Sequence, residues 1–133
     1  MLAKSMFAVA ALSLAVTPAL AQKLPEIPAG NHYVCYPAKG EFKERKASFV
    51  TQFGEIDTVV TGITRICAPA EKRYNSKITP IVNKALHLVC YAIKVENPKP
   101  LPKALINNQF GGVTLTVGQP NEICLPSGKV LLN

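Results

Sequence analysis

The strongest constraint on the fold of this chain is an internal repeat. Three motifs occur twice in the same order: His-x-Val-Cys-Tyr, Gln-Phe-Gly and Ile-Cys-x-Pro-x-x-Lys. The first copies begin at His32, Gln52 and Ile66, and the second copies begin at His87, Gln109 and Ile123. The offset is 55 residues for the first motif (87 − 32) and 57 for the second (109 − 52), which an insertion of two residues near 96–102 explains. We therefore interpret the chain as a tandem duplication.

The repeat divides the chain into two units, residues 32–72 and 87–129, joined by a linker, residues 73–86. A unit of about 40 residues is small for a stable core of its own, so we expect one β domain over residues 22–133. A proline-rich lead, residues 24–28, precedes the first unit and should run along the surface. For the linker, from Arg73 to Leu86, a helical turn, a strand and a loop all remain open.

Residues 1–21 have the features of a signal peptide. Lys4 supplies the positive start, residues 6–16 form an apolar run, and Ala19 and Ala21 are small residues at the positions that signal peptidase recognises. The apolar run is too short to span a bilayer, and the mature chain contains no transmembrane segment. We expect cleavage after Ala21 and an exported protein, either periplasmic or secreted.

The pattern of residues within each unit is typical of β-strands. Residues 113–117 alternate apolar and polar side chains, as in a half-buried strand, and residues 49–53, 56–60 and 88–93 are rich in β-branched or aromatic residues. Eleven prolines and eight glycines indicate many turns, and no segment has the spacing of an amphipathic helix. The predicted fold class is all-β: a small pseudo-symmetric sandwich or barrel, built from the two repeats and stapled by disulfides.

Four cysteines in an exported domain of this size are most simply two disulfides. The favoured pairing is Cys35 with Cys67 and Cys90 with Cys124, because a duplicated unit most simply carries its own disulfide. The alternative, Cys35 with Cys90 and Cys67 with Cys124, would link matching strands of the two units and stays open. No Cys-x-x-Cys motif is present, so redox catalysis of that type is not indicated.

A zinc site is a further reading of the His-x-x-Cys motifs, because two His and two Cys could bind zinc tetrahedrally. Residues three apart on a strand point to opposite faces, so His32 and Cys35 would not converge, and neither would His87 and Cys90. We expect no metal and no cofactor. Both histidines should be structural, bonded to a backbone group or placed at the start of a strand.

Aromatic and glycine positions of the repeat also have structural interpretations. We expect Phe53 and Phe110 to fill the core, and Gly54 and Gly111 to permit a turn or a bulge. Tyr36 and Tyr91 are expected to be core or interface aromatics.

The sequence offers no catalytic constellation. The mature chain contains one Asp, Asp57, and three Ser, none within a nucleophile motif. The formal charge is +7, or +6 without Lys4, and the basic residues are scattered without the aromatic interleaving that binds nucleic acid. A positive protein of this kind would favour an anionic envelope polymer or an acidic protein as its partner, and no nucleic acid.

Together the paired motifs resemble a repeat in secreted bacterial proteins, a family known only as a domain of unknown function. The resemblance covers residues 31–129 and implies a bacterial, exported, disulfide-containing module, without supplying catalytic or binding residues. We therefore expect a non-catalytic binding or structural module of the bacterial envelope or exterior. An exported inhibitor of an envelope or host enzyme is the alternative, and an enzyme with an unrecognised site is the third possibility.

Overall fold

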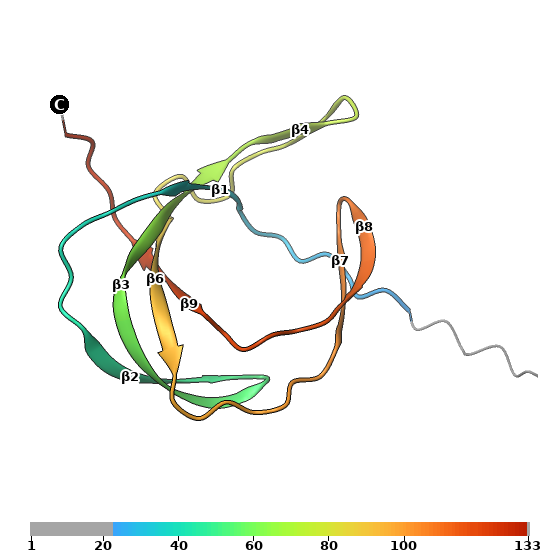
Figure 1. Ribbon diagram of the computed structural model, residues 1–133. Helices are drawn as coiled ribbons and strands as arrows, with labels where there is room; N and C mark the ends of the chain where they lie inside the picture. The colour runs from blue at the N-terminus through green and yellow to red at the C-terminus, as the bar shows by residue number, and fades with distance from the viewer. Residues whose placement is uncertain (1–22, 133) are drawn as a thin grey trace, which may run out of the picture.

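The computed structural model describes residues 23–132, and this part of the chain forms nine β-strands and no helix (Figure 1). The strands are β1 (His32–Pro37), β2 (Arg45–Thr51), β3 (Gly54–Ala70), β4 (Lys72–Tyr74), β5 (Lys77–Thr79), β6 (His87–Val95), β7 (Ala104–Asn108), β8 (Gly111–Leu115) and β9 (Glu122–Ser127). The all-β prediction is confirmed. The expected signal peptide lies outside the described residues.

Five of the strands form one antiparallel sheet. Its order is β1-β3-β6-β9, and β2 also pairs with β3. β3 is the longest strand: β2 pairs with its first half and β1 with its second half, while β6 pairs with it from Thr58 to Cys67. Figure 1 shows β3 as a long curved ribbon that crosses the molecule beside β6. Because β3 belongs to the first repeat unit and β6 to the second, the sheet joins the two units.

The pairing of β3 with β6 contains two irregularities, at which Thr61 and Thr64 are left out of the ladder. Such bulges increase the local twist of a strand. Each threonine lies within hydrogen-bond distance of a β6 carbonyl: Thr61 Oγ1 is 3.3 Å from Ala92 O, and Thr64 Oγ1 is 3.1 Å from Cys90 O. The hydroxyl groups thus keep β3 attached to β6 where the backbone ladder is interrupted.

The second unit departs from the first at Pro120. With the offset of 57, Pro120 corresponds to Ile63, which lies inside β3, whereas residues 116–121 are a loop between β8 and β9. Proline has no N–H to donate to a ladder, so it interrupts a strand at this point. In consequence β7 and β8 form a separate two-stranded sheet, as do β4 and β5. The described strands form one open sheet and two hairpins, without closing into a barrel, and the expected pseudo-symmetric packing is not seen.

The buried residues lie on the two central strands. In the described part of the chain they are Thr58, Val60, Cys67, His87, Cys90 and Ile93. All six come from β3 or β6, three from each strand. The core is therefore shared by the two units.

Phe53 and Phe110 do not fill this core, contrary to the expectation from the sequence. Their exposed fractions are 45% and 76%. Each is the second residue of a two-residue hairpin turn, because the strands on either side pair up to Thr51 and Gly54 and up to Asn108 and Gly111. A side chain at the tip of such a hairpin points away from the sheet that the hairpin belongs to.

The glycines of the two turns behave as expected. Gly54 has φ 112° and Gly111 has φ 108°, values that residues with a side chain rarely adopt. In both turns the backbone N–H of the Phe also donates to the side chain two residues earlier, Thr51 Oγ1 at 3.0 Å and Asn108 Oδ1 at 2.8 Å. The same local geometry thus occurs at matching positions of both units.

The structure differs from the sequence-based expectations for Tyr36 and for the strand around residue 113. Tyr36 is 55% exposed on β1, so it is not a core residue, whereas Tyr91 is half-buried and packs against Phe42 with the ring centroids 5.0 Å apart. The strand expected at 113–117 is β8, which ends at Leu115, and all its residues are exposed. It pairs with β7 in a separate two-stranded sheet.

The linker is a hairpin followed by an irregular segment. β4 and β5 pair antiparallel around Asn75 and Ser76, which have φ values of 49° and 59°. Two consecutive residues with positive φ form the type I′ turn that matches the twist of a hairpin. Residues 80–86 then lead to β6 without a helix. Within residues 23–132, no helix is long and apolar enough to cross a membrane.

Candidate functional site

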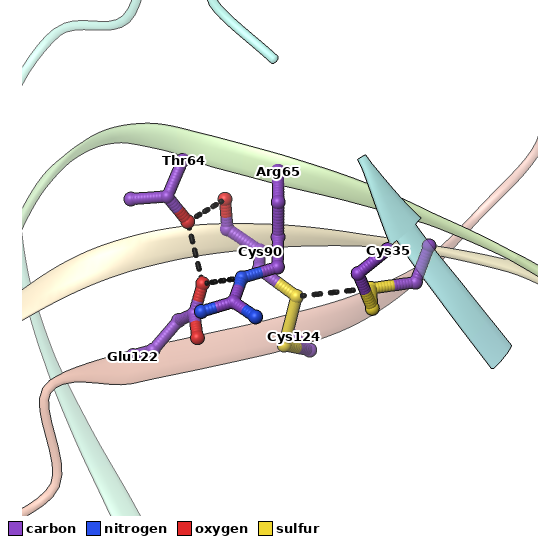
Figure 2. A network of polar contacts seen from close by, with 7 residues as sticks. Cys35, Thr64, Arg65, Cys90, Glu122 and Cys124 are labelled. Atoms are coloured by element: carbon purple, nitrogen blue, oxygen red, sulfur yellow. Dashed lines mark hydrogen bonds and ion pairs between the residues drawn. A yellow bond between two sulfur atoms is a disulfide. The ribbon is translucent and has the colours of Figure 1, made fainter. Parts of the chain in front are cut away.

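The four cysteines lie together in the middle of the sheet, joined as Cys35–Cys67 and Cys90–Cys124 (Figure 2). This is the pairing within each unit that the repeat favours. The first disulfide links β1 to β3 and the second links β6 to β9, each between residues directly opposite in the register. Because β3 and β6 are neighbours, the disulfides also contact each other: Cys67 Sγ lies 3.9 Å from Cys90 Sγ. Neither sulfur carries a proton, so this is a van der Waals contact.

A thiolate zinc site is absent from the described residues, because their cysteines are all in disulfides. The sulfurs of Cys90 and Cys124 and a carboxylate oxygen of Glu122 do lie within 4.8 Å of one another. Disulfide sulfurs are not thiolates and are poor metal ligands. Glu122 instead accepts a hydrogen bond from Arg65 Nε at 2.7 Å.

Glu122 connects three strands. Thr64 Oγ1 lies 2.5 Å from Glu122 Oε1 and 3.1 Å from the carbonyl oxygen of Cys90, so its hydroxyl can donate to either acceptor. Arg65 on the same strand completes the contact with Glu122, whose side chain is only 19% exposed. Figure 2 shows this network beside the two disulfides. It fastens the start of β9 to β3 across β6.

The two repeated histidines have different partners. His87, at the start of β6, is buried, and its Nδ1 lies 3.3 Å from the carbonyl oxygen of Ala85, which requires Nδ1 to donate. His32, at the start of β1, is half-buried, and its Nε2 lies 3.1 Å from Gln109 Oε1. The Nδ1 atom of His32 is buried and has no hydrogen-bond partner among residues 23–132. The first histidine motif thus contacts the second Gln-Phe-Gly motif.

A concave surface lies between the β4–β5 hairpin, the tip of the β7–β8 hairpin and the lead before β1. It consists of two adjoining hollows of about 470 and 620 Å³, which share Ile27, Thr79, Asn108 and Gln109. We call this surface the hairpin cleft. Its lining residues are 27–32 of the lead, Lys72, Tyr74, Asn75, Lys77, Thr79, Pro80, Val82, Asn107, Asn108, Gln109 and Gly111. In Figure 1 the two hairpins reach towards each other on the side of the molecule where the lead passes.

Several contacts hold the three walls of the hairpin cleft in place. Asn107 Nδ2 donates to the carbonyl oxygen of Pro25 in the lead at 3.0 Å. Asn31 is bonded to the segment before β6, with its Oδ1 accepting from the backbone N–H of Val82 at 2.7 Å. Gln109 Nε2 lies 3.4 Å from Thr79 Oγ1 and joins one hairpin to the other. The lead is therefore part of the site.

An aromatic and cationic group lies at the meeting point of the two hairpins. The rings of Tyr74 and Phe110 pack edge to face, with their centroids 5.5 Å apart. Lys72 Nζ lies over both rings, 5.7 Å from the centroid of Tyr74 and 5.3 Å from that of Phe110. Such positions give a favourable interaction between an ammonium group and an aromatic face. Phe110 thus contacts the other hairpin although most of its surface is exposed.

The charged residues that line the hairpin cleft, among those the structure describes, are Lys72 and Lys77. No described carboxylate lines it; Glu71 nearby is paired with Arg73 at 2.9 Å. The remaining lining groups that can form hydrogen bonds are mainly amides, namely Asn31, Asn75, Asn107, Asn108 and Gln109. The cleft therefore offers positive charge, an aromatic surface and uncharged hydrogen-bonding groups together.

Smaller hollows occur elsewhere. One of about 320 Å³ on the sheet is lined by Phe42, Arg45 and Tyr91 among others, and Arg45 lies 5.4 Å from the centroid of the Phe42 ring. Another, of about 210 Å³ and mostly apolar, lies beside Phe53 and Lys99. Lys99 Nζ donates to the carbonyl oxygen of Glu55 at 2.8 Å, so its charge is already used in a structural contact.

The sequence does not predict the hairpin cleft, because its walls are far apart along the chain. The linker, for which the sequence permits a helical turn, a strand or a loop, supplies most of β4 and all of β5. The dipeptide Asn75-Ser76 between Tyr74 and Lys77 was an available turn signal. Comparison with protein-family models, curated proteins and solved structures finds no match to this chain.

Proposed function

We propose that this protein is an exported, non-catalytic binding module that holds an acidic polysaccharide of the bacterial envelope in the hairpin cleft. Lys72 and Lys77 would pair with carboxylate or phosphate groups on the polymer. The amide side chains of the cleft would form hydrogen bonds with its hydroxyl groups. The exposed ring surfaces of Tyr74 and Phe110 would pack against the apolar face of a sugar.

The observation that carries this proposal is the position of Lys72 over two aromatic rings, at the edge of a hollow that no described carboxylate lines. A lysine without an acidic partner keeps its charge available for a ligand. Its hydration is already reduced on the side that faces the rings, so pairing with an anion requires less further desolvation than for a fully hydrated lysine. The net positive charge of the chain also favours approach of an anionic polymer.

The hairpin cleft is shallow and open, as suits a polymer that extends beyond the site. Its two hollows follow one another along the lead, from the hairpin tips to His32. A chain molecule could lie along this path and contact both hollows. Compact small-molecule sites are usually more enclosed and more apolar.

The first experiment measures binding of polygalacturonate, an acidic polysaccharide, with neutral dextran as the comparison. Isothermal titration calorimetry should detect binding of polygalacturonate, with affinity that falls as salt concentration rises. The double variant K72A/K77A should lose at least about tenfold in affinity, since two charge-assisted contacts are removed.

The matched control is Lys129→Ala, which removes an exposed lysine that does not line the hairpin cleft. It should leave the affinity within about twofold, since only the overall charge is reduced. If K129A and the cleft variants weaken binding equally, the interaction is a general effect of charge and the cleft is not the site. Equal affinity for dextran and polygalacturonate would also contradict the proposal.

A further inference from the structure

The four cysteine sulfurs form a row across the sheet that the binding function does not use. The row crosses four neighbouring strands: Cys35 on β1, Cys67 on β3, Cys90 on β6 and Cys124 on β9. The inner residues, Cys67 and Cys90, are 2% and 0% exposed, and the outer residues, Cys35 and Cys124, are exposed. The inner sulfurs lie 3.9 Å apart, and Figure 2 marks the contact between the two disulfides with a dashed line. Each disulfide thus has one end that solvent can reach and one end against its neighbour.

We propose that the two disulfides form a site of thiol–disulfide exchange, at which an external dithiol opens one disulfide and the neighbouring disulfide rearranges. The product would be a single Cys67–Cys90 disulfide between the central strands, with the thiols of Cys35 and Cys124 free. This reaction needs only the sulfurs of the row and a dithiol as the reductant. It does not depend on the binding of a polysaccharide.

In the first step, a thiolate of the dithiol attacks Cys35 Sγ, because this end of the disulfide is exposed. A bond forms between the external sulfur and Cys35, the Cys35–Cys67 bond breaks, and Cys67 leaves as a thiolate with the electron pair. Exchange of this kind proceeds through such a mixed disulfide. The thiolate of Cys67 is then buried beside Cys90.

In the second step, the Cys67 thiolate attacks Cys90 Sγ. The Cys67–Cys90 bond forms, the Cys90–Cys124 bond breaks, and Cys124 leaves with the electron pair and takes a proton from water. The second thiol of the dithiol then displaces Cys35 from the mixed disulfide. In sum, one dithiol is oxidised to its disulfide, and one of the two protein disulfides is reduced to two thiols.

Burial gives this rearrangement its direction. A thiolate is poorly solvated in a buried, apolar position, so charge on Cys67 is disfavoured relative to charge on exposed Cys124. Exchange moves the free thiol from the buried to the exposed end of the row. The guanidinium group of Arg65, bonded to Glu122, offsets the carboxylate charge that lies near the Cys124 sulfur.

The register of β3 and β6 is compatible with the new disulfide. Cys67 is opposite Leu88, and Cys90 is opposite Arg65, so the two cysteines occupy diagonal positions of neighbouring strands. Their sulfurs must approach from 3.9 Å to about 2 Å, the length of a disulfide bond. Cys90 Sγ is the sulfur of the second disulfide that Cys67 Sγ contacts, which is why the attack is assigned to Cys90.

A matched pair of variants tests the exchange on the whole chain. Cys35→Ser leaves Cys67 as the unpaired cysteine, and Cys67→Ser leaves Cys35. Each folded protein is alkylated with iodoacetamide without reductant, digested at acidic pH and mapped by mass spectrometry. For C35S we expect the alkyl group on Cys124 and a Cys67–Cys90 disulfide. For C67S we expect the alkyl group on Cys35 and an intact Cys90–Cys124 disulfide.

A C35S protein that retains Cys90–Cys124 and has Cys67 as its free thiol would overturn the proposal. The unaltered protein provides the second arm, which does not depend on folding of a variant. It is treated with a limiting amount of dithiothreitol and then alkylated. The species that has lost one disulfide should contain alkyl groups on Cys35 and Cys124. Alkyl groups on both cysteines of one original disulfide would mean that the two disulfides are reduced independently, and the exchange site does not exist.

Discussion

Gly54 and Gly111 act through their backbone conformation. Each follows a two-residue turn and starts a strand with a φ value above 100°. The phenylalanine before each glycine takes its position from the same turn, so Phe53 and Phe110 are presented at hairpin tips. Phe110 there meets Tyr74 and Lys72. The short Gln-Phe-Gly motif therefore forms a hairpin turn and places an aromatic ring at the tip of the hairpin.

Replacement of these glycines tests the role of the turn. Gly54→Ala and Gly111→Ala should each lower the free energy of unfolding by about 1–3 kcal/mol, because a side chain is strained at positive φ. Gly118→Ala is the matched control: its φ is not in the positive range and an added Cβ would meet no atom within 4 Å. It should change the free energy of unfolding by less than about 0.5 kcal/mol in urea titrations followed by circular dichroism. Equal effects at Gly111 and Gly118 would show that the backbone conformation is unimportant.

At the scale of elements, the sheet is held by side chains as well as by its backbone ladder. Thr61 and Thr64 lie at the two irregularities of β3 and reach carbonyl groups of β6. Glu122 at the start of β9 contacts Thr64 and Arg65 on β3. These contacts stabilise the sheet near the disulfides, where the ladder between β3 and β6 is least regular.

The Glu122 network gives a prediction for this scale. Glu122→Gln keeps the shape of the side chain but removes its charge, so the hydrogen bond from Arg65 is weakened. We expect the free energy of unfolding to fall by about 1 kcal/mol. In the control variant Glu71→Gln, the altered pair with Arg73 is more exposed, at 39% and 77%, and the change should be close to zero. The free energy of unfolding of both variants is measured in parallel by urea titration. Equal, negligible changes would show that Glu122 forms only an ordinary surface ion pair.

At the scale of the whole molecule, β3 and β6 make the two units interdependent. Their pairing runs through the centre of the five-stranded sheet, and all six buried residues of the described chain belong to these two strands. The hairpins β4–β5 and β7–β8 lie outside this sheet and contact each other through the rings of Tyr74 and Phe110. The described buried residues form one core to which both units contribute, so the two units should unfold together.

Ile93→Ala tests this dependence. Ile93 is 8% exposed on β6, opposite Val60 of β3. Truncation should lower the free energy of unfolding by about 2–4 kcal/mol and shift one cooperative thermal transition of the whole chain. Val50→Ala, at a position that is 79% exposed on β2, is the control and should have little effect. Two separate transitions in calorimetry, of which I93A shifts only one, would show that the units fold as separate domains.

How far the sequence predicts this protein depends on the distance over which each interaction acts. The turn glycines could be predicted, because φ preference is local to Gly54 and Gly111. The β pattern predicted residues 88–93 of β6 and 49–51 of β2, since alternation and β-branching act within a strand, but the strand expected at 49–53 ends at Thr51 and Gln52 and Phe53 form a turn. The core position of Phe53 was wrong, because hydrophobicity alone does not say whether a side chain is at a tip or between layers.

The sequence by itself determined the strand-rich fold class and the turns at Gly54 and Gly111, since both depend on preferences that are local in the chain. The tertiary structure alone decided that the two disulfides touch, because this depends on the register between β3 and β6. It also decided that Lys72 and Phe110, which are 38 residues apart (110 − 72), contact each other where the two hairpins meet. Contacts of this kind arise from packing between segments that are distant in the chain, so no local pattern of residues predicts them.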